Sequence, residues 1–375
     1  MLQGVHLTLM IGPAVAVPVP KAVLDALQRV KITIKARETS GFELVFSLNN
    51  RSPLQTLFLL AGGSTIPLLR VIIVVTINGT ANVLMDGVVT QQQIAPGSDA
   101  STSTLTVTGE DLTRAMDYID FSGIPYPAMP VEARIAVILA KYAALGVIPR
   151  IVPRILTETP IPTKQIPKHE GKDKAYIETL AREAGYVFYL DPGPSPGTSV
   201  AYWGPEVKIG RPQPALRTNM DAHTNVESLS FRFDGDGRTL PVLLIQEQKS
   251  HVSIPIPIPN INPLNPPLGA IPPIPKEIEK IPTTAKLSAI GAALLGVARA
   301  SRSADAVTGN GSLDVLRYGR VLQARKLVGV CGAGTAFDGL YYVDSVEHDI
   351  KRGEYKQQFT LTRNGLVSLV DKVPA

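Results

Sequence analysis

The sequence has few of the residues on which most catalytic and metal sites depend. Its 375 residues include one cysteine, one tryptophan and five histidines, and aromatic residues make up 6% of the chain. The single thiol, Cys331, excludes a disulfide framework within the chain and a cysteine-based zinc site. It has no local signature of a nucleophile, so we interpret it as a small residue in a strand or turn.

Sequence motifs of enzymes are also missing. The histidines (His6, His169, His223, His251 and His348) form no metal-binding spacing, and His348 lies in an alternating segment typical of a sheet face. There is no GxSxG motif and no Walker lysine. The glycines at 332–334 lack the third glycine and following helix of a dinucleotide loop. We therefore predict no catalytic, cofactor-binding or metal-binding residues and no enzymatic activity.

Two acidic features have simpler interpretations. The segment Phe233–Arg238 begins like a calcium loop, but Arg238 replaces an oxygen ligand and no glutamate closes the loop, so we expect a hairpin turn. Glu170, Glu178 and Glu183 have no evident carboxylate partner for glycosidase chemistry. An unrecognised hydrolase stays open as an alternative, because catalytic triads need not be close in sequence.

Long apolar runs and concentrated charge are absent too. No stretch reaches the ~18 apolar residues of a membrane-spanning helix, so we expect no integral membrane segment. No Lys or Arg precedes the apolar part of residues 1–20, which argues against a signal peptide. The net charge is +5, and the densest basic segment, 299–326, has no interleaved aromatics, so no specific nucleic-acid binding is expected. We interpret that segment as a solvated or subunit-facing surface.

The remaining composition is that of a globular protein, with 45% hydrophobic and 18% charged residues. Residues 1–113 consist of short alternating or apolar runs, which predict a first β-barrel domain. The run at 71–77 should be buried on both faces and end in a hairpin turn at Asn78-Gly79. Residues 114–225 predict an α/β domain, with helices at 111–118, 130–145 and 172–184 and strands at 186–190 and 200–203.

The last third of the chain returns to strands around a proline-rich tract. Residues 226–248 plus 313–375 predict a second β-barrel domain, and residues 249–312 predict a Pro-rich insertion followed by a helix from Thr284 to Ala300. Proline lacks an N–H group, so the tract Ser253–Pro282 should be extended, and its isoleucines suggest that it packs on protein.

The two β regions also resemble each other. Val89 precedes Val107 by 18 residues, and Val343 precedes Leu361 by 18. Turns containing glycine fall at matching offsets, and both segments close with alternating strands. We predict that residues 71–108 and 325–362 are equivalent hairpins of two similar barrels, with these four side chains in the barrel cores. The expected fold class is β-rich α+β, with two similar antiparallel β-barrels flanking the α/β domain.

Three stretches resemble the late control gene D family of phage tails, which is related to the hub part of type VI secretion VgrG proteins and to hubs of extracellular contractile injection systems. They are STLTVTGEDLTRAMD at 103–117, KDKAYIETLAREAGYVFYLDPG at 172–193 and the segment 313–365. The Pro-rich tract lies outside the likeness. We treat it as an insertion.

The resemblance implies a baseplate hub that assembles as a homotrimer between a sixfold inner tube and a threefold spike. Two similar barrels in each of three chains would present six similar surfaces to the tube. Further implied partners are other baseplate subunits and, since the sequence ends soon after the second β region, a separate spike protein. The chain would be cytoplasmic during assembly and then part of an injection particle. The alternative is a β-rich surface or glycan-binding protein, which would need an exposed aromatic groove.

Overall fold

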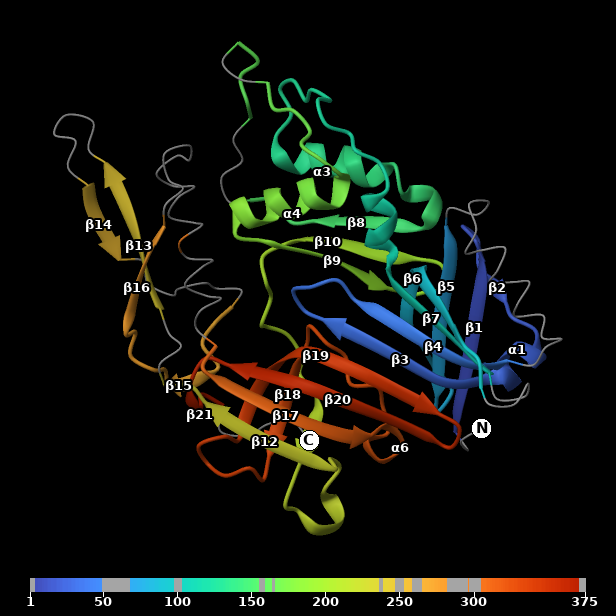
Figure 1. Cartoon of the computed structure of the whole chain (residues 1–375). Coiled ribbons are helices and arrows are strands. Elements are labelled where there is room, and N and C mark those ends of the chain that lie inside the picture. Colours follow the sequence, from blue (N-terminus) through green and yellow to red (C-terminus); the bar gives the residue numbers. More distant parts are fainter. Residues whose placement is uncertain are drawn as a thin grey trace.

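The computed structural model describes residues 4–48, 68–97, 103–154, 159–163, 166–235, 239–246, 253–257, 265–281, 296 and 305–370. Large antiparallel strands form its base, and a block of helices over a small sheet lies above them (Figure 1). The chain is β-rich, as the alternating segments predict.

The first β region forms neighbouring strands in the order β3-β4-β7-β6-β5-β1-β2. Their bounds are β1 Val5–Pro13, β2 Val17–Pro18, β3 Leu27–Lys35, β4 Gly41–Leu48, β5 Leu69–Ile77, β6 Thr80–Ala95 and β7 Ser103–Asp111, with helix α1 at Lys21–Ala26. Strand β5 is almost wholly buried on both faces, as expected. Asn78 (φ 49°) and Gly79 (φ 79°) are both left-handed, which suits the tight β5–β6 turn predicted there.

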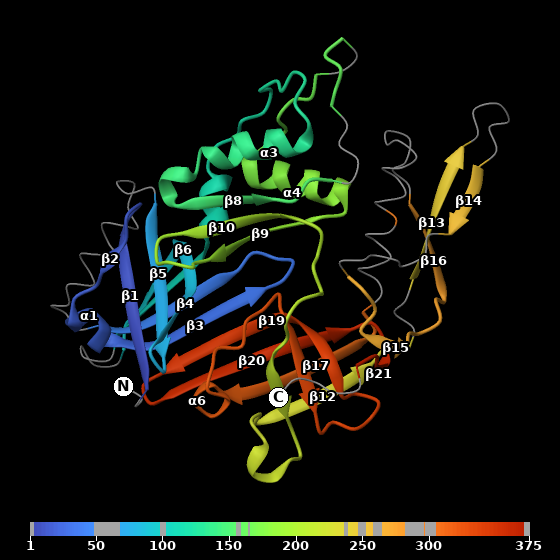
Figure 2. The ribbon, with the colours of Figure 1, turned by 180° about the vertical axis from the view of Figure 1, so that it is seen from behind.

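The middle of the chain, which we call the α/β block, has helices and strands close to the predicted positions. Its elements are the 3-10 helices Leu112–Asp117 and Ala143–Leu145, helices α3 (Val131–Ala140) and α4 (Asp173–Ala184), and strands β8 (Val147–Ile151), β9 (Val187–Pro192) and β10 (Ser199–Gly204). The strands pair in the order β8-β10-β9, and α3 and α4 cover one face of this sheet (Figures 1 and 2). Gly185 ends α4 with φ 70°, as its position after the apolar periodicity predicts.

The second β region comprises strands on both sides of the Pro-rich tract. They are β11 (Gln213–Arg217), β12 (Ser228–Phe233), β17 (Val307–Asp314), β18 (Leu327–Cys331), β19 (Gly339–Lys351) and β20 (Glu354–Arg363), with the short helix α6 at Val315–Tyr318. Strand β11 lies in the range expected for the α/β domain, yet it pairs in parallel with β18. The exact domain boundaries stay a prediction.

The predicted repeat is present as two antiparallel meanders, β5-β6-β7 and β18-β19-β20. Each central strand has a register shift at the same place, after Val89 in β6 and after Val343 in β19. Val343 pairs with Leu361 and Val89 pairs with Gly109, so the position equivalent to Leu361 is Gly109 and not the predicted Val107. The predicted alignment of the last strands of the two meanders is therefore wrong by two residues. Because side chains alternate with period two, the core faces stay in phase.

The two β regions are joined into one 13-stranded sheet. Strand β19 is 13 residues long, so its first part pairs with β18 and its second part, from Ser345 to Lys351, pairs with β3. A single apolar core runs beneath both regions and contains Val107, Val343 and Leu361. Each fully buried aliphatic side chain of this kind contributes about 1.5–3 kcal/mol. The two halves share strand hydrogen bonds and a core, and their division into two barrels remains a proposal.

The Pro-rich tract is extended where the structure describes it. Strands β13 (Thr239–Gln246), β14 (Ser253–Pro257) and β16 (Glu277–Ile281) form a separate sheet with the prolines of β14 at an edge, where a missing N–H is tolerated. Strand β15 (Gly269–Ile271) pairs with β21 (Leu366–Ser368), and Leu268 is buried beside Tyr342. The helix expected from Thr284 lies outside the described residues, except for helical Gly296.

Two expectations for this region are wrong. Strands β12 and β13 do not form a hairpin about Phe233–Arg238, because β12 pairs with β17 whereas β13 pairs with β14 and β16. For the same reason, β13 does not join the second β region. After β12, the N–H of Asp234 instead donates to the carbonyl of Ala306, the residue just before β17.

Candidate functional site

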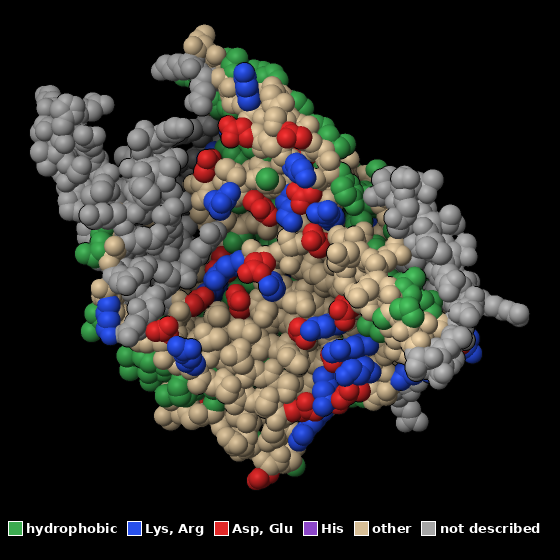
Figure 3. Space-filling model, in the orientation of Figure 1, with side chains coloured by type: hydrophobic (Ala, Val, Ile, Leu, Met, Phe, Trp, Pro, Cys, Tyr) green, Lys and Arg blue, Asp and Glu red, His purple; other side chains and the backbone are tan. Residues whose placement is uncertain are grey.

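Charged side chains join the two β regions at the paired strands β3 and β19. Arg29 makes a bidentate contact with Asp349 (Nε–Oδ1 2.8 Å, Nη2–Oδ2 3.0 Å). Lys31 Nζ lies 3.0 Å from Glu347 Oε1, and Lys351 Nζ lies 3.2 Å from Asp349 Oδ2. Figure 3 shows blue and red side chains interleaved over these strands. Partial burial raises the pKa of Asp349, but the hydrogen bonds from Arg29 and Lys351 outweigh it and keep this pKa below its ordinary value.

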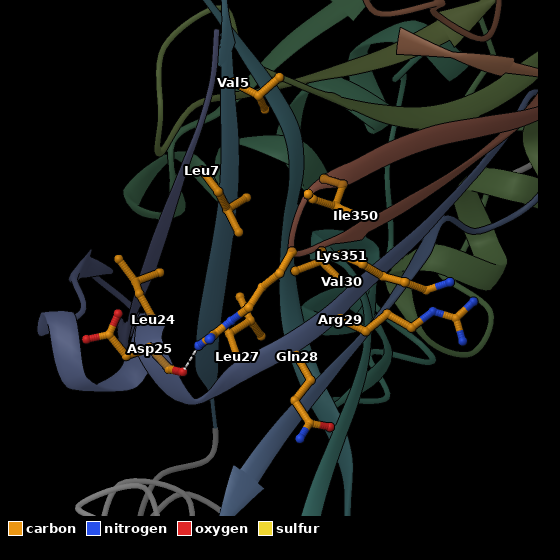
Figure 4. Close-up of a pocket in the computed structure, with 12 residues that line it drawn as sticks. Val5, Leu7, Leu24, Asp25, Leu27, Gln28, Arg29, Val30, Ile350 and Lys351 are labelled. Atoms are coloured by element: carbon orange, nitrogen blue, oxygen red, sulfur yellow. Dashed lines mark hydrogen bonds between the residues drawn. The ribbon is translucent and has the colours of Figure 1, made fainter. Parts of the chain in front are cut away.

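A pocket of about 250 Å³ opens at one end of this pair. Its apolar walls come from three elements: Val5 and Leu7 of β1, Leu24 and Leu27 near α1, and Ile350 of β19 (Figure 4). At its rim, Arg352 donates to the backbone carbonyl of Asp25. The lining includes one carboxylate and no histidine, cysteine or serine, so it offers a place for an apolar side chain and no nucleophile–base pair.

A buried ion pair connects the first β region to the α/β block. Arg70 of β5 binds Asp86 of β6 through both carboxylate oxygens (Nε–Oδ1 2.7 Å, Nη2–Oδ2 2.6 Å). Arg70 also donates to the carbonyls of Ala14 and Gly197, and Ser199 Oγ donates to Asp86 at 3.2 Å. Arg70 and Asp86 are 4% and 2% exposed, so the pair is removed from water. The additional hydrogen bonds to Ala14, Gly197 and Ser199 offset the cost of burying these two charges.

A second charged cluster fixes the chain where it re-enters the sheet at β17. Asp305 accepts two hydrogen bonds from Lys208 Nζ (2.7 and 2.9 Å) and one from Arg37 Nη2 (3.2 Å). Arg37 also pairs bidentately with Glu206. Burial raises the pKa of Asp305, but Lys208 and Arg37 outweigh that effect and hold this pKa below its ordinary value.

Arg325 connects all three parts of the chain. Its backbone is left-handed (φ 63°), and its guanidinium lies 4.0 Å from the ring centroid of Tyr189 in β9. It donates to the carbonyl of Lys35 at 2.7 Å and to Asp191 at 3.2 Å. The first β region, the α/β block and the second β region are thus held at one residue.

One histidine–carboxylate pair escaped the sequence analysis. His169 Nε2 lies 3.3 Å from Asp173 Oδ1, and its Nδ1 lies 3.0 Å from Tyr126 Oη. Asp173 accepts from Lys141 and Tyr142. Burial lowers the pKa of His169, which favours the neutral ring. His169 and Asp173 are 1% and 0% exposed and line none of the described cavities, so they are a structural cluster without substrate access. The i,i+4 spacing of His169 and Asp173 is the sequence signal that could have revealed this pair.

The other residues considered from the sequence stay apart from one another. His348 is on β19, as expected, and is buried. His223 is exposed in a 3-10 turn (Asp221–His223), and Cys331 ends β18 half-buried. Within the described ranges, no three histidine, cysteine or acidic side chains gather as a metal site. In the same ranges, no helix has the length and apolarity to cross a bilayer.

An apolar patch is exposed around the β15–β21 pair. Its side chains are Ile271, Ile274, Val367, Leu369 and Val370, which are 38–80% exposed. Figure 3 shows green side chains at this corner of the molecule, beside grey atoms. Exposed apolar patches of this kind are typical of interaction surfaces.

Comparison with solved structures identifies the fold. A tail protein of Neisseria meningitidis aligns with 97% of this chain and 98% of its own, with 14% identity and a TM-score of 0.63. The 43 kDa tail protein of prophage MuSo2 from Shewanella oneidensis aligns with 96% and 98%, at 17% identity and a TM-score of 0.62. An E. coli component of the type VI secretion system covers 93% of this chain, with 76% of its own length, 10% identity and a TM-score of 0.51.

No protein-family model and no curated protein matches the sequence. At identities of 17% or less, the likeness establishes the fold. The chain therefore has, over nearly its whole length, a fold found in phage-tail proteins and in a type VI secretion component. This agrees with the tail-hub resemblance in its coarser form.

Proposed function

We propose that this chain is a structural hub subunit of a phage-tail-like contractile injection particle, of the late control D type, and not an enzyme. The observation that carries the proposal is the likeness to two tail proteins, which extends over nearly the whole of each aligned chain. The pocket at the end of the β3–β19 pair supports it, because its lining includes no serine, threonine, cysteine or histidine. Function does not follow from fold alone, so the proposal needs its own test.

The proposed assembly is a homotrimer that joins a sixfold inner tube to a threefold spike on a separate chain, with other baseplate subunits around it. The two meanders with matching bulges support this arrangement, since three chains can meet six tube subunits only through two similar faces each. The shared core and the buried charges at Arg70, Asp305 and Arg325 suit a part that transmits load without internal movement. Assembly would take place in the cytoplasm before the particle is completed.

Native mass spectrometry of the purified chain, alone and with the particle's spike protein, tests the trimer. We expect a species near 120 kDa, three times the 40.1 kDa chain. Electron microscopy of the intact particle should place the chain between tube and spike on a threefold axis. A chain that stays monomeric with the spike present, or that lies outside this axis, would refute the hub assignment.

The alternative of a glycan-binding protein has less support. Among the described residues, the strongly exposed aromatic side chains are Tyr118 and Phe233, at 44% and 38%. They lie on separate elements, one after a 3-10 helix of the α/β block and one at the end of β12. Neither lines a described cavity, so no aromatic platform for a sugar is formed by them.

A further inference from the structure

A large groove lies between the β5–β6 turn and the second β region, and the proposed function does not use it. Its volume is about 830 Å³, within the roughly 300–1,000 Å³ typical of ligand sites. Three segments line it: Ile77–Asn82 at the turn, Arg211–Pro214 at the start of β11, and Tyr318–Lys326 before β18. We call it the junction groove.

The walls of the junction groove are bonded to one another. Asn78 Nδ2 donates to the carbonyl of Gly319 at 3.4 Å, and Tyr318 Oη donates to the carbonyl of Pro214 at 2.6 Å. Gln213 and Gln323 exchange two hydrogen bonds, from Gln213 Nε2 to the Gln323 carbonyl and from the Gln323 N–H to Gln213 Oε1. The groove is thus pre-formed and does not depend on a ligand for its shape.

The charge of the groove has one sign. Its lining includes Arg211, Arg320 and Lys326, all exposed, and no acidic residue. None of the three cations forms an ion pair with a described residue. The adjoining hollow has one carboxylate in its lining, Asp191, and this group accepts a hydrogen bond from Arg325. Three cations that face one hollow and have no described ion-pair partner favour an anionic ligand.

The shape and polarity of the groove favour a peptide. The adjoining hollow, of about 250 Å³, shares Asn82, Val321, Gln323 and Lys326 with it and extends it along residues 81–84 of β6. Strand β7 pairs with β6 only from Gly87 onward, so that stretch of β6 has no strand partner on the β7 side within the described residues. An extended segment can lie beside such an edge.

Nucleic acid fits the groove less well. Single strands bind by stacking bases on exposed aromatic rings, and the one aromatic residue in the lining, Tyr318, is 9% exposed with its hydroxyl occupied. We propose that the junction groove binds an extended, acidic segment of a partner protein.

A fluorescein-labelled hexaglutamate peptide is the probe, and binding to the full-length chain is followed by fluorescence anisotropy. We expect saturable binding that weakens as NaCl is raised, because exposed charge pairs are screened by salt. The triple variant Arg211→Glu, Arg320→Glu and Lys326→Glu should weaken binding about tenfold or more, because each substitution replaces an attraction to the acidic probe with a repulsion.

The matched control carries Lys21→Glu, Lys168→Glu and Arg232→Glu, three exposed cations outside both hollows that form no ion pair with a described residue. Its net charge change equals that of the groove variant, and we expect it to bind the probe within about twofold of the unmodified chain. Equal losses in both variants, or no binding of hexaglutamate, would overturn the proposal. So would tighter binding of a labelled dT hexamer that depends on the same three groove cations. Circular dichroism of each variant checks that the fold is retained.

Discussion

His348 allows a quantitative test of the core beneath the β3–β19 pair. Its side chain is 1% exposed, and its Nδ1 lies 2.8 Å from Tyr355 Oη and 3.4 Å from Gln357 Nε2. Burial lowers the pKa of His348 to about 3. In the unfolded chain the pKa returns to about 6.5, so acid protonates the unfolded state first.

The sign and size of the effect follow from this difference. Between pH 6.5 and pH 3 the unfolded state binds one more proton than the folded state at this residue, so stability falls as the pH falls. Each pH unit costs about 1.4 kcal/mol, which gives about 3 kcal/mol between pH 7 and pH 4. The variant His348→Gln keeps a polar group near Tyr355 but cannot titrate, so it should lose about 3 kcal/mol less over this range.

Urea unfolding followed by circular dichroism, at half-unit steps from pH 7 to pH 4, measures this difference. The baseline cost of the substitution cancels, because only the change in the gap between variant and unmodified chain with pH is read. His223→Gln is the matched control, since His223 is exposed in a turn. Parallel pH curves for His348→Gln and the unmodified chain would show that His348 titrates normally in the folded state and that the burial argument is wrong.

Three further outcomes are expected. Arg70→Met should cost about 3–5 kcal/mol in urea unfolding because it strands a buried carboxylate, and adding Asp86→Leu should restore much of this loss; a small single-variant cost would mean that the pair is hydrated. Asp305→Asn should destabilise the chain above about pH 4 and lose its effect in stronger acid, since a lowered carboxylate pKa stabilises only while the group is ionised; the gap between the two pH–stability curves measures it. Deleting Ser253–Pro282 should weaken particle assembly in a sedimentation assay and leave the circular dichroism of the large sheet intact; loss of that signal would show that the tract belongs to the core.

Local features of the fold were predictable because their signals are local. The turn at Asn78-Gly79, the buried strand β5 and helix α4 ending at Gly185 each follow from residue type and periodicity. The repeat was also visible, but its register was not. Both meanders have a bulge at the same place, but the chain between the paired residues Gln91 and Thr108 is two residues longer than that between Ser345 and Thr360. Counting residues therefore aligned Val107 instead of Gly109 with Leu361.

Long-range pairing was not predictable in the same way. Nothing in the segments of β12 and β13 distinguishes a hairpin from two strands that belong to different sheets, because both have strand character and a turn signal lies between them. The union of β3 with β19 depends on the length of β19 and on partners far away in sequence. The charged groups at Asp305 and Arg325 were missed for the same reason, since their partners come from other parts of the chain.

The β3–β19 pair also sets the order in which the chain can fold. Arg29 and its partner Asp349 are separated by 320 residues, so at about 5–20 residues synthesised per second β3 waits roughly 15–60 s for its neighbour. During this interval the nascent chain presents an open strand edge, the kind of surface that recruits other chains into aggregates. Lys31 and Lys35 lie on β3, and charge on an edge strand discourages such pairing. We expect these lysines, which face β19 in the folded protein, to discourage pairing of β3 with other chains until β19 has been synthesised.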